Sequence, residues 1–286
     1  MIAAGPDDLG LGAWRRDRGT VLHRGGGRPV ADPAPLTIVA QSHSHSVAAE
    51  WSPHVHPMHE LVWVRGGTLT SRIGHQIFTV PAGFGMWLPA GVVHGGRVTA
   101  AAQLHSAFFA PGRIPVEFSG PTSITITPLL ESLLVRLGRT DLDEGARARA
   151  EAVVFDVLEA AERQFALDLP GDHRIDAIAE ALIDDPSDDR SLAEWAAQLG
   201  TSDRTITRAF REATGLSFAQ WRQARRIHAA LALLSAGADV QEVSELLGYA
   251  QPSTFIAAFR RVMKVTPGTL AKTSGPGLSE NPYPLS

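Results

Sequence analysis

The sequence predicts a multidomain α and β protein with an all-β N-terminal domain, a helical segment after it and an all-α C-terminal domain. Three observations lead to this fold class. Short runs of β-branched and aromatic residues, separated by Gly and Pro, fill residues 36–127. From Pro128 onward, apolar residues recur at helical spacing instead. Toward the C-terminus one pattern occurs twice, in which a helix stops at a glycine and a second helix begins after a short turn.

The composition of the 286-residue chain excludes several classes of protein. It contains no cysteine, so we expect neither a disulfide framework nor a thiolate metal site. No apolar run approaches the length of a membrane span, and the N-terminus lacks the basic-then-apolar order of a signal peptide. We therefore expect a cytoplasmic protein that does not associate with membranes.

The two ends of the chain are expected to be flexible. Residues 1–35 are rich in Gly, Pro and Arg and include three consecutive glycines at 25–27. These residues favour turns and irregular backbone, which predicts a flexible N-terminal arm. We expect residues 274–286, beyond the last predicted helix, to form a flexible tail.

Residues 36–127 form the predicted β domain. Runs of strand-forming residues occur at 61–64, 68–73, 76–80 and 86–88, and Gly or Pro residues lie between them. Many short strands at this spacing are typical of an all-β sandwich or barrel.

One stretch of the β domain concentrates residues that bind divalent metals. His54 and His56 lie two apart, so on a strand both face the same side. A straight strand at ~3.3 Å per residue would place Glu60 about 20 Å from His54, which is too far for both to bind one ion. A shared metal site therefore requires a bend between them, and Pro57 is the expected place. His94 would arrive from a neighbouring strand after a Pro-Ala-Gly turn. Three imidazoles and a carboxylate suit Zn, Fe, Ni or Mn.

The spacing of these residues resembles both halves of the cupin signature. The first half is HxH, three residues, E, six residues and G, and it runs from His54 to Gly67. The second half is G, five residues and PxGxxH, and it runs from Gly83 to His94. The resemblance covers roughly residues 36–110 and implies a cupin-type β-barrel (jelly roll) in which His54, His56, Glu60 and His94 hold a divalent metal. Regulatory cupins also bind a small effector without metal, so both alternatives stay open.

Residues 128–169 form the predicted helical segment. Five leucines, Leu129, Leu130, Leu133, Leu134 and Leu137, fall at helical spacing. An alanine-rich helix is expected over residues 144–165, before Pro170 and Gly171 break the chain. The apolar faces of these helices need a partner surface, which the β domain or a second subunit can supply, and we expect the segment to pair two subunits in a homodimer.

Residues 170–273 form the predicted DNA-binding domain, which contains two helix-turn-helix units. In the first unit, residues 192–199 precede Gly200, and Ser202 caps a second helix with Ile206 and Phe210 on its core face. The second unit repeats this plan, with Gly248 in the turn and with Phe255 and Phe259 in the core positions 49 residues later. In a helix-turn-helix, the second helix enters the major groove of DNA.

The expected DNA-reading residues lie on the exposed faces of these second helices. In the first unit they are Arg204, Thr207, Arg208 and Arg211, and in the second Gln251, Ser253, Thr254, Ala257 and Arg260. Arginine suits bidentate contact with guanine, whereas short or apolar side chains suit thymine methyls and phosphates. We therefore expect the two helices to contribute unequally. Residues 191–273 carry ten basic and six acidic side chains, a net charge of +4, although the whole chain has a net charge of −4.

One long helix is expected between the two units, over residues 218–234. Arg222, Arg225 and Arg226 lie on one side of it. They would either reach DNA phosphates or pair with nearby carboxylates that fix the orientation of the two units, and the structural role is favoured for Arg226.

Residues 173–271 resemble the AraC/XylS family of bacterial transcription regulators. The resemblance depends on the run Phe210 to Phe218 in the first unit, and on Gly248, Tyr249, Phe255, Phe259, Arg260, Thr266 and Pro267 in the second. The family usually has glycine where this chain has Lys264, at an expected left-handed helix end where a non-glycine residue costs about 1 kcal/mol. Members commonly join an N-terminal cupin to such a DNA-binding half. The resemblance implies that one subunit places its two recognition helices in successive major grooves.

These observations predict a sequence-specific DNA-binding transcription regulator whose cupin domain senses a small molecule or a divalent metal. Its expected partners are double-stranded DNA, the effector, a second copy of the chain and, for an activator, RNA polymerase. The alternative is a metal-dependent cupin enzyme, an oxygenase or isomerase, that carries a DNA-binding half. We do not expect an enzyme, because no dedicated acid or nucleophile accompanies the candidate ligands.

Overall fold

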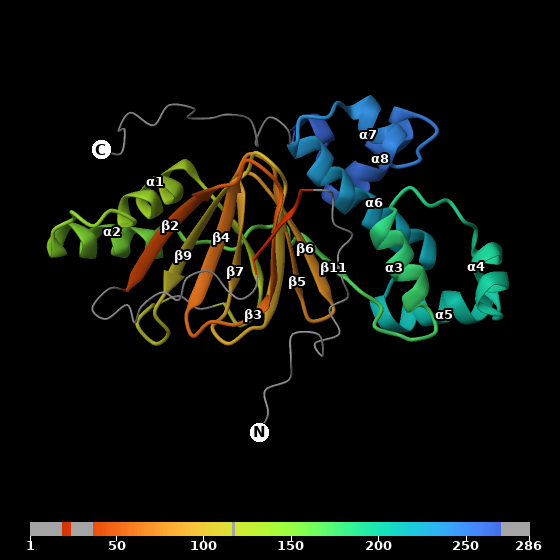
Figure 1. Cartoon of the computed structure of the whole chain (residues 1–286), viewed down its shortest axis with the longest axis horizontal. Helices are drawn as coiled ribbons and strands as arrows, with labels where there is room; N and C mark the ends of the chain where they lie inside the picture. Colours follow the sequence, from red (N-terminus) through yellow and green to blue (C-terminus); the bar gives the residue numbers. More distant parts are fainter. Residues whose placement is uncertain (1–18, 24–36, 116–117, 270–286) are drawn as a thin grey trace, which may run out of the picture.

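The computed structural model describes residues 19–23, 37–115 and 118–269. In that part of the chain, two β-sheets face each other, two helices cover one of them, and the other helices form a separate lobe (Figure 1). No described helix has both the length and the apolar character needed to cross a membrane. The predicted tail at 274–286 and most of the predicted arm at 1–35 lie outside the described residues.

The β domain is a two-sheet jelly roll, as the sequence predicts. The six-stranded sheet has the order β1 (Val21–His23), β3 (Ala49–His54), β8 (His94–Val98), β5 (Thr68–Ile73), β6 (Gln76–Pro81) and β11 (Ala166–Asp168). The five-stranded sheet has the order β10 (Thr122–Thr125), β7 (Phe84–Leu88), β4 (His59–Arg65), β9 (Gln103–Phe109) and β2 (Ile38–Ser44). Neighbouring strands are antiparallel except β1, which pairs with β3 in parallel.

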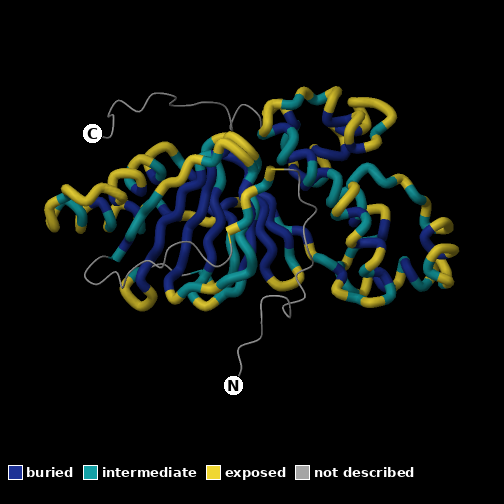
Figure 2. Tube along the Cα trace, viewed as in Figure 1, coloured by how far each residue is buried: buried dark blue, intermediate teal, exposed yellow. Residues whose placement is uncertain are grey.

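Alternation along β4 separates two apolar cores. Val62 and Val64 point between the sheets, where they pack against side chains that include Leu69 and Phe78. Leu61 and Trp63 point to the outer face of the five-stranded sheet and pack under the helical segment. Figure 2 shows these strands as the most buried part of the domain. Successive side chains of one strand therefore serve different cores, and Glu60 belongs to the inner set.

Two helices cover the outer face of the five-stranded sheet. They are α1 (Pro128–Leu137) and α2 (Glu144–Val157), and α1 begins where the Thr127 side chain accepts a hydrogen bond from the Leu130 amide. The prediction that the second helix reaches residue 165 was wrong. After Val157 the backbone instead pairs with β10, because the carbonyl of Glu159 accepts from Thr125 and the amide of Ala161 donates to Ser123.

The C-terminal lobe contains both predicted helix-turn-helix units. Its helices are α3 (Asp176–Asp184), α4 (Leu192–Leu199), α5 (Asp203–Thr214), α6 (Phe218–Ser235), α7 (Val240–Leu246) and α8 (Pro252–Met263). Helices α4 and α5 form the first unit, α7 and α8 form the second, and α6 connects them. Gly200 and Gly248 turn the chain with φ values of +62° and +71°, which cost glycine little. Lys264 ends α8 with a φ of +57°, the left-handed conformation expected there.

Strand β11 ties the two halves of the protein together. It pairs with β6 as the edge strand of the six-stranded sheet. Phe165, just before it, is buried in the core of the second unit, and Leu167 is buried in the core of the first. The Trp221 indole of α6 also donates a hydrogen bond to the carbonyl of Asp168, at 2.7 Å. The segment expected to be wholly helical, 128–169, thus ends in a strand shared by three structural units.

Helix α6 lies against the outer face of the six-stranded sheet (Figure 1). The contacts include polar groups, because the Thr68 hydroxyl donates to the carbonyl of Leu231 at 3.4 Å and the His228 ring meets the Thr79 hydroxyl at 3.2 Å. All four residues are buried. The connecting helix of the C-terminal lobe is therefore also the element that docks on the β domain.

Candidate metal centre and DNA-binding surface

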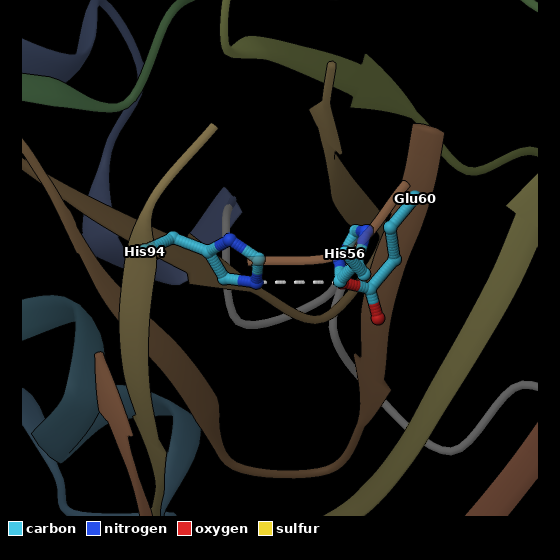
Figure 3. A group of neighbouring side chains, drawn as sticks. All are labelled: His56, Glu60 and His94. Atoms are coloured by element: carbon cyan, nitrogen blue, oxygen red, sulfur yellow. Dashed lines mark hydrogen bonds and ion pairs between the residues drawn. The ribbon is translucent and has the colours of Figure 1, made fainter. Parts of the chain in front are cut away.

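Three predicted metal ligands converge at one end of the jelly roll (Figure 3). The Glu60 Oε2 atom lies 3.1 Å from His56 Nε2 and 3.7 Å from His94 Nε2. Glu60 lies near the start of β4, and His94 is the first residue of β8. His56 precedes a bend at Pro57 and Met58 between β3 and β4, where the sequence required one. This bend brings an imidazole back over the carboxylate that follows it by four residues.

The fourth predicted ligand, His54, lies beside this group rather than in it. Its ring is 4.3 Å from the His94 ring and 6.2 Å from the His56 ring, measured between centroids. Among the described residues, only His56, Glu60 and His94 bring ligand atoms within 4.8 Å of one another as a set. The structure therefore brings three of the four predicted ligands together and places the fourth imidazole next to them.

Backbone carbonyls fix the tautomer of these imidazoles. His56 Nδ1 donates to the carbonyl of Met58 at 2.7 Å, and His94 Nδ1 donates to that of Val92 at 3.0 Å. His54 Nδ1 makes the same kind of bond to Ser52, at 2.8 Å. A carbonyl only accepts, so Nδ1 carries the proton and Nε2 is available as a ligand. Metal-binding histidines commonly donate their other ring N–H to a backbone carbonyl in this way. Two imidazole Nε2 atoms and one carboxylate are ligands that suit a divalent ion.

The charges in the group are strongly coupled. Burial alone would raise the pKa of Glu60, but the hydrogen bond from His56 and the nearby imidazole charges lower it. Burial likewise opposes protonation of His56, yet the hydrogen bond to Glu60 and the charge of that carboxylate raise its pKa. Burial lowers the pKa of His94 to about 4. A divalent metal bound at Nε2 of His56 would displace the proton that the neighbouring carboxylate favours on that imidazole.

Strand β9 supplies one wall of the candidate metal centre. The Ser106 side chain donates a hydrogen bond to Glu60, and the Phe108 ring meets the His56 ring edge-on with centroids 5.4 Å apart. Met58 and Ala110 complete a small apolar cluster with Phe108. These residues were not predicted as part of the site, although alternation along β9 places 104, 106 and 108 on one face.

Two other histidines of the β domain face the opposite way and pack against tryptophans. His59 stacks on Trp87 at 5.2 Å and accepts a hydrogen bond from the Ala90 amide. His105 stacks on Trp63 at 5.0 Å, and its Nδ1 lies 2.7 Å from the Ser42 hydroxyl. Neither belongs to the candidate metal centre.

The exposed face of α5 carries the predicted DNA-reading arginines. Arg204, Arg208 and Arg211 are exposed and Thr207 is half-buried, whereas Ile206 and Phe210 are fully buried. Arg208 lies 3.6 Å from the carboxylate of Glu212, one turn along the helix. Such an exposed pair is weak, so Arg208 can exchange this partner for another acceptor.

The equivalent face of α8 has a different chemistry. Gln251, Ser253, Thr254, Ala257 and Arg260 are all exposed, as expected. A hollow runs along this face, and its lining residues are Ser253, Ile256, Ala257, Arg260, Arg261 and Thr266. The first helix therefore presents guanidinium groups, whereas the second presents short and apolar side chains with arginines at its far end.

All three arginines of α6 bind backbone carbonyls of the segment 183–190. Arg222 donates to the carbonyl of Arg190, and Arg225 donates to that of Ile183, each at 2.8 Å. Arg226 donates to the carbonyl of Pro186, also at 2.8 Å. The structural role predicts carboxylate partners, and in this detail the prediction was wrong, because each arginine donates to a backbone carbonyl of the same chain instead.

Both halves of the chain are similar to known protein families. Residues 41–158 match a family described as the AraC-like ligand binding domain, and residues 195–273 match a helix-turn-helix domain. The chain is 31% identical over 219 residues to the HTH-type transcriptional regulator NimR of Escherichia coli (strain K12), across 75% of this chain and 80% of NimR. It is 28% identical over 226 residues to the regulator RipA of Corynebacterium glutamicum, across 73% of this chain and 60% of RipA. The solved structure of ToxT from Vibrio cholerae O395 aligns with a TM-score of 0.36 and 12% identity, across 85% of this chain and 99% of ToxT.

Proposed function

Because this chain belongs to the AraC family of helix-turn-helix transcriptional regulators, we propose that it senses a divalent metal ion in its N-terminal domain and controls its binding to DNA accordingly. His56, Glu60 and His94 would hold the ion. The observation that carries the proposal is the fixed tautomer of the imidazoles, which directs Nε2 of His56 and His94 toward one carboxylate. A bound ion would supply a positively charged cross-link between β8 and the segment that leads into β4.

The donor set is compatible with several metals and with an added effector. Two imidazoles and one carboxylate suit Zn, Fe, Ni or Mn, and three protein ligands leave further coordination positions open. A small molecule could occupy such a position beside the apolar wall of Met58 and Phe108. The relatives NimR and RipA are transcriptional regulators, and we propose no enzymatic activity.

The metal proposal is tested with His56→Ala/His94→Ala. The wild-type protein should retain a divalent metal after dialysis, and chelation should change its affinity for DNA. The double variant should lose both the metal and the response to chelator, because only one of the three ligands remains. Metal analysis by mass spectrometry and a DNA-binding titration measure the two results.

His173→Ala is the matched control for this experiment, because the side chain of His173 is 95% exposed and lies outside the group. If the double variant responds to chelator as the wild type does, the histidines are not the sensor. If the wild-type protein retains no metal, the metal proposal is wrong, and a small molecule would be the remaining candidate for the effector.

We also propose that the two recognition helices contribute unequally to DNA recognition. Arg204→Ala or Arg208→Ala should weaken binding to a selected site by about 1–3 kcal/mol and relax the base preference, because a guanidinium contact with a base is lost. Ser253→Ala should cost much less, since a short hydroxyl makes few base contacts. Titration of each variant against the selected duplex and its single-base variants measures both effects. A larger loss of sequence preference from Ser253→Ala would contradict the assignment.

A homodimer formed through α1 and α2 is the third part of the proposal. Leu129, Val135 and Val153 are exposed apolar residues on these helices, whereas Leu130 and Leu134 are buried beneath them. Leu129→Glu should convert a dimer to a monomer at micromolar concentration, because burial of the new charge in an interface is costly. Sedimentation velocity measures the change.

Leu246→Glu on α7 is the matched control, since Leu246 is as exposed as Leu129, at 53%. A wild-type protein that sediments only as a monomer in the presence of DNA would exclude the dimer. If the protein proves to be an activator, RNA polymerase is a further partner.

A further inference from the structure

Arg226 lies where the two helix-turn-helix units meet. Its Nε donates to the carbonyl of Pro186 at 2.8 Å. Its Nη2 donates to the carbonyls of Ser187 and Asp188 at 3.1 and 3.2 Å. These three carbonyls belong to the loop between α3 and α4, on the side of the first unit. One guanidinium therefore holds three consecutive backbone groups of that loop.

The same guanidinium faces the turn of the second unit. It lies 5.5 Å from the centroid of the Tyr249 ring, within the range of a cation–π contact. A Cβ atom on Gly248 would lie 3.1 Å from the carbonyl oxygen of Ser187 and 3.4 Å from Nη2 of Arg226. The turn between α7 and α8 thus approaches the α3–α4 loop closely, and Arg226 lies between them.

Besides this junction, the two units are connected through α6 and through the segment 165–167, whose Phe165 and Leu167 lie in different cores. Each unit has its own buried core among the described residues, one around Phe210 and Trp221 and the other around Phe255 and Phe259. The units are connected by α6, which is continuous and therefore sets their separation. Rotation of the second unit about its attachment to α6 is opposed where its turn meets the loop, which is the place that Arg226 occupies.

We propose that Arg226 is a positioning residue that fixes the relative orientation of α5 and α8, and thereby determines which spacing of two half-sites on DNA the protein accepts. The inference rests on the proposed function, in which both helices enter the major groove. Successive major grooves on one face of DNA lie about 34 Å apart, and one added base pair rotates a half-site by about 35°. A rigid junction therefore accepts one spacing, and a loosened junction accepts several.

Arginine suits this position better than lysine. Its planar fork has five N–H donors, which can meet three carbonyls at once while its face meets an aromatic ring. A lysine ammonium is a point charge on a flexible stem, so it would keep part of the contact without its geometry. Arg226→Lys should therefore relax the spacing preference less than Arg226→Ala.

The test is a selection with the full-length protein. The probe is a pool of duplexes in which two randomised half-sites are separated by spacers that differ by single base pairs. Wild-type protein should enrich one spacer over its neighbours by about tenfold or more. A preference of this size is comparable to the effect of one mismatched base pair in a specific site. Arg226→Ala should reduce this preference to about twofold, while the bases enriched within each half-site stay the same.

Arg222→Ala is the matched control, because Arg222 binds the same segment at Arg190, whereas its guanidinium lies over the ring of Phe218 in the core of the first unit. It should keep the wild-type spacer preference. Tyr249→Ala removes the other side of the junction and should relax the preference, which keeps the inference testable if Arg226→Ala folds poorly. Circular dichroism and thermal unfolding establish that each variant is folded.

The outcomes separate this inference from the proposed function. An unchanged spacer preference in folded Arg226→Ala and Tyr249→Ala would overturn the positioning role alone. Uniformly weaker binding at every spacing would also overturn it, because that is the effect of lost stability. Failure of the wild type to enrich paired half-sites would overturn the proposed placement of both helices on DNA.

Discussion

Phe165→Ala is expected to destabilise the protein by about 3–5 kcal/mol, the usual loss when a buried phenylalanine is truncated. Phe165 lies between the halves of the molecule, where its ring is 4.7 Å from that of Phe84 on β7 and belongs to the core of the second helix-turn-helix unit. Neighbours from two structural units cannot both move inward to fill the resulting cavity. Chemical denaturation followed by far-UV circular dichroism measures the loss.

Leu129→Ala is the control, because it removes an exposed apolar side chain from α1. It should change stability by less than about 0.5 kcal/mol in the monomer. A small effect of Phe165→Ala would show that the second unit does not depend on this residue.

A fragment of residues 170–286 is expected to fold poorly, because it lacks both Phe165 and Leu167. A fragment that begins before Phe165 retains both residues.

Acidification is expected to destabilise the protein through two buried neutral histidines. Burial and the charge of Arg225 lower the pKa of His228 to about 3, and burial and the charge of Arg65 lower that of His105 to about 4. The unfolded chain therefore binds protons below pH 6.5 that the folded chain does not bind. The stability that each histidine contributes is complete above pH 6.5 and is lost as the pH falls toward its folded value. At pH 5 the loss is about 2 kcal/mol for each.

His228→Gln measures the contribution of the domain interface. Relative to wild type, this variant should gain about 2 kcal/mol between pH 7.5 and pH 5, because glutamine does not titrate. His105→Gln should show a gain of similar size from the outer face of the five-stranded sheet. His173→Gln is the exposed control and should follow the wild-type curve. Parallel curves for wild type and His228→Gln would show that folding does not lower the pKa of His228.

The sequence predicted the elements whose signals are local. Ser202 caps α5 and Gly200 precedes it in a left-handed turn, so the first helix-turn-helix unit could be placed from neighbouring residues alone. The meeting of His56, Glu60 and His94 could also be predicted, because their spacing and the bend at Pro57 are sequence features. The position of His54, beside the group that these three form, depends on the exact path of that bend, which the sequence does not specify.

Features that depend on backbone partners could not be predicted. The carbonyls that hold Arg226 and the imidazole Nδ1 atoms belong to residues of any type, so no side-chain pattern marks them. Strand β11 is three residues long, and its partner β6 lies about 90 residues earlier in the chain. Its residues, Ala166 to Asp168, continue an alanine-rich run, and local propensity therefore favoured helix there.

Strand β11 also bears on the order in which the two halves of the protein fold during synthesis. As the chain leaves the ribosome, the six-stranded sheet is complete, apart from its edge, before any helix of the DNA-binding lobe has been made. Phe165 and Leu167 are then held at that edge, and the helices made afterwards close around them. A nascent chain whose β domain has misfolded would lack this template, so a folded DNA-binding lobe would be acquired only by molecules whose ligand-binding domain has also folded.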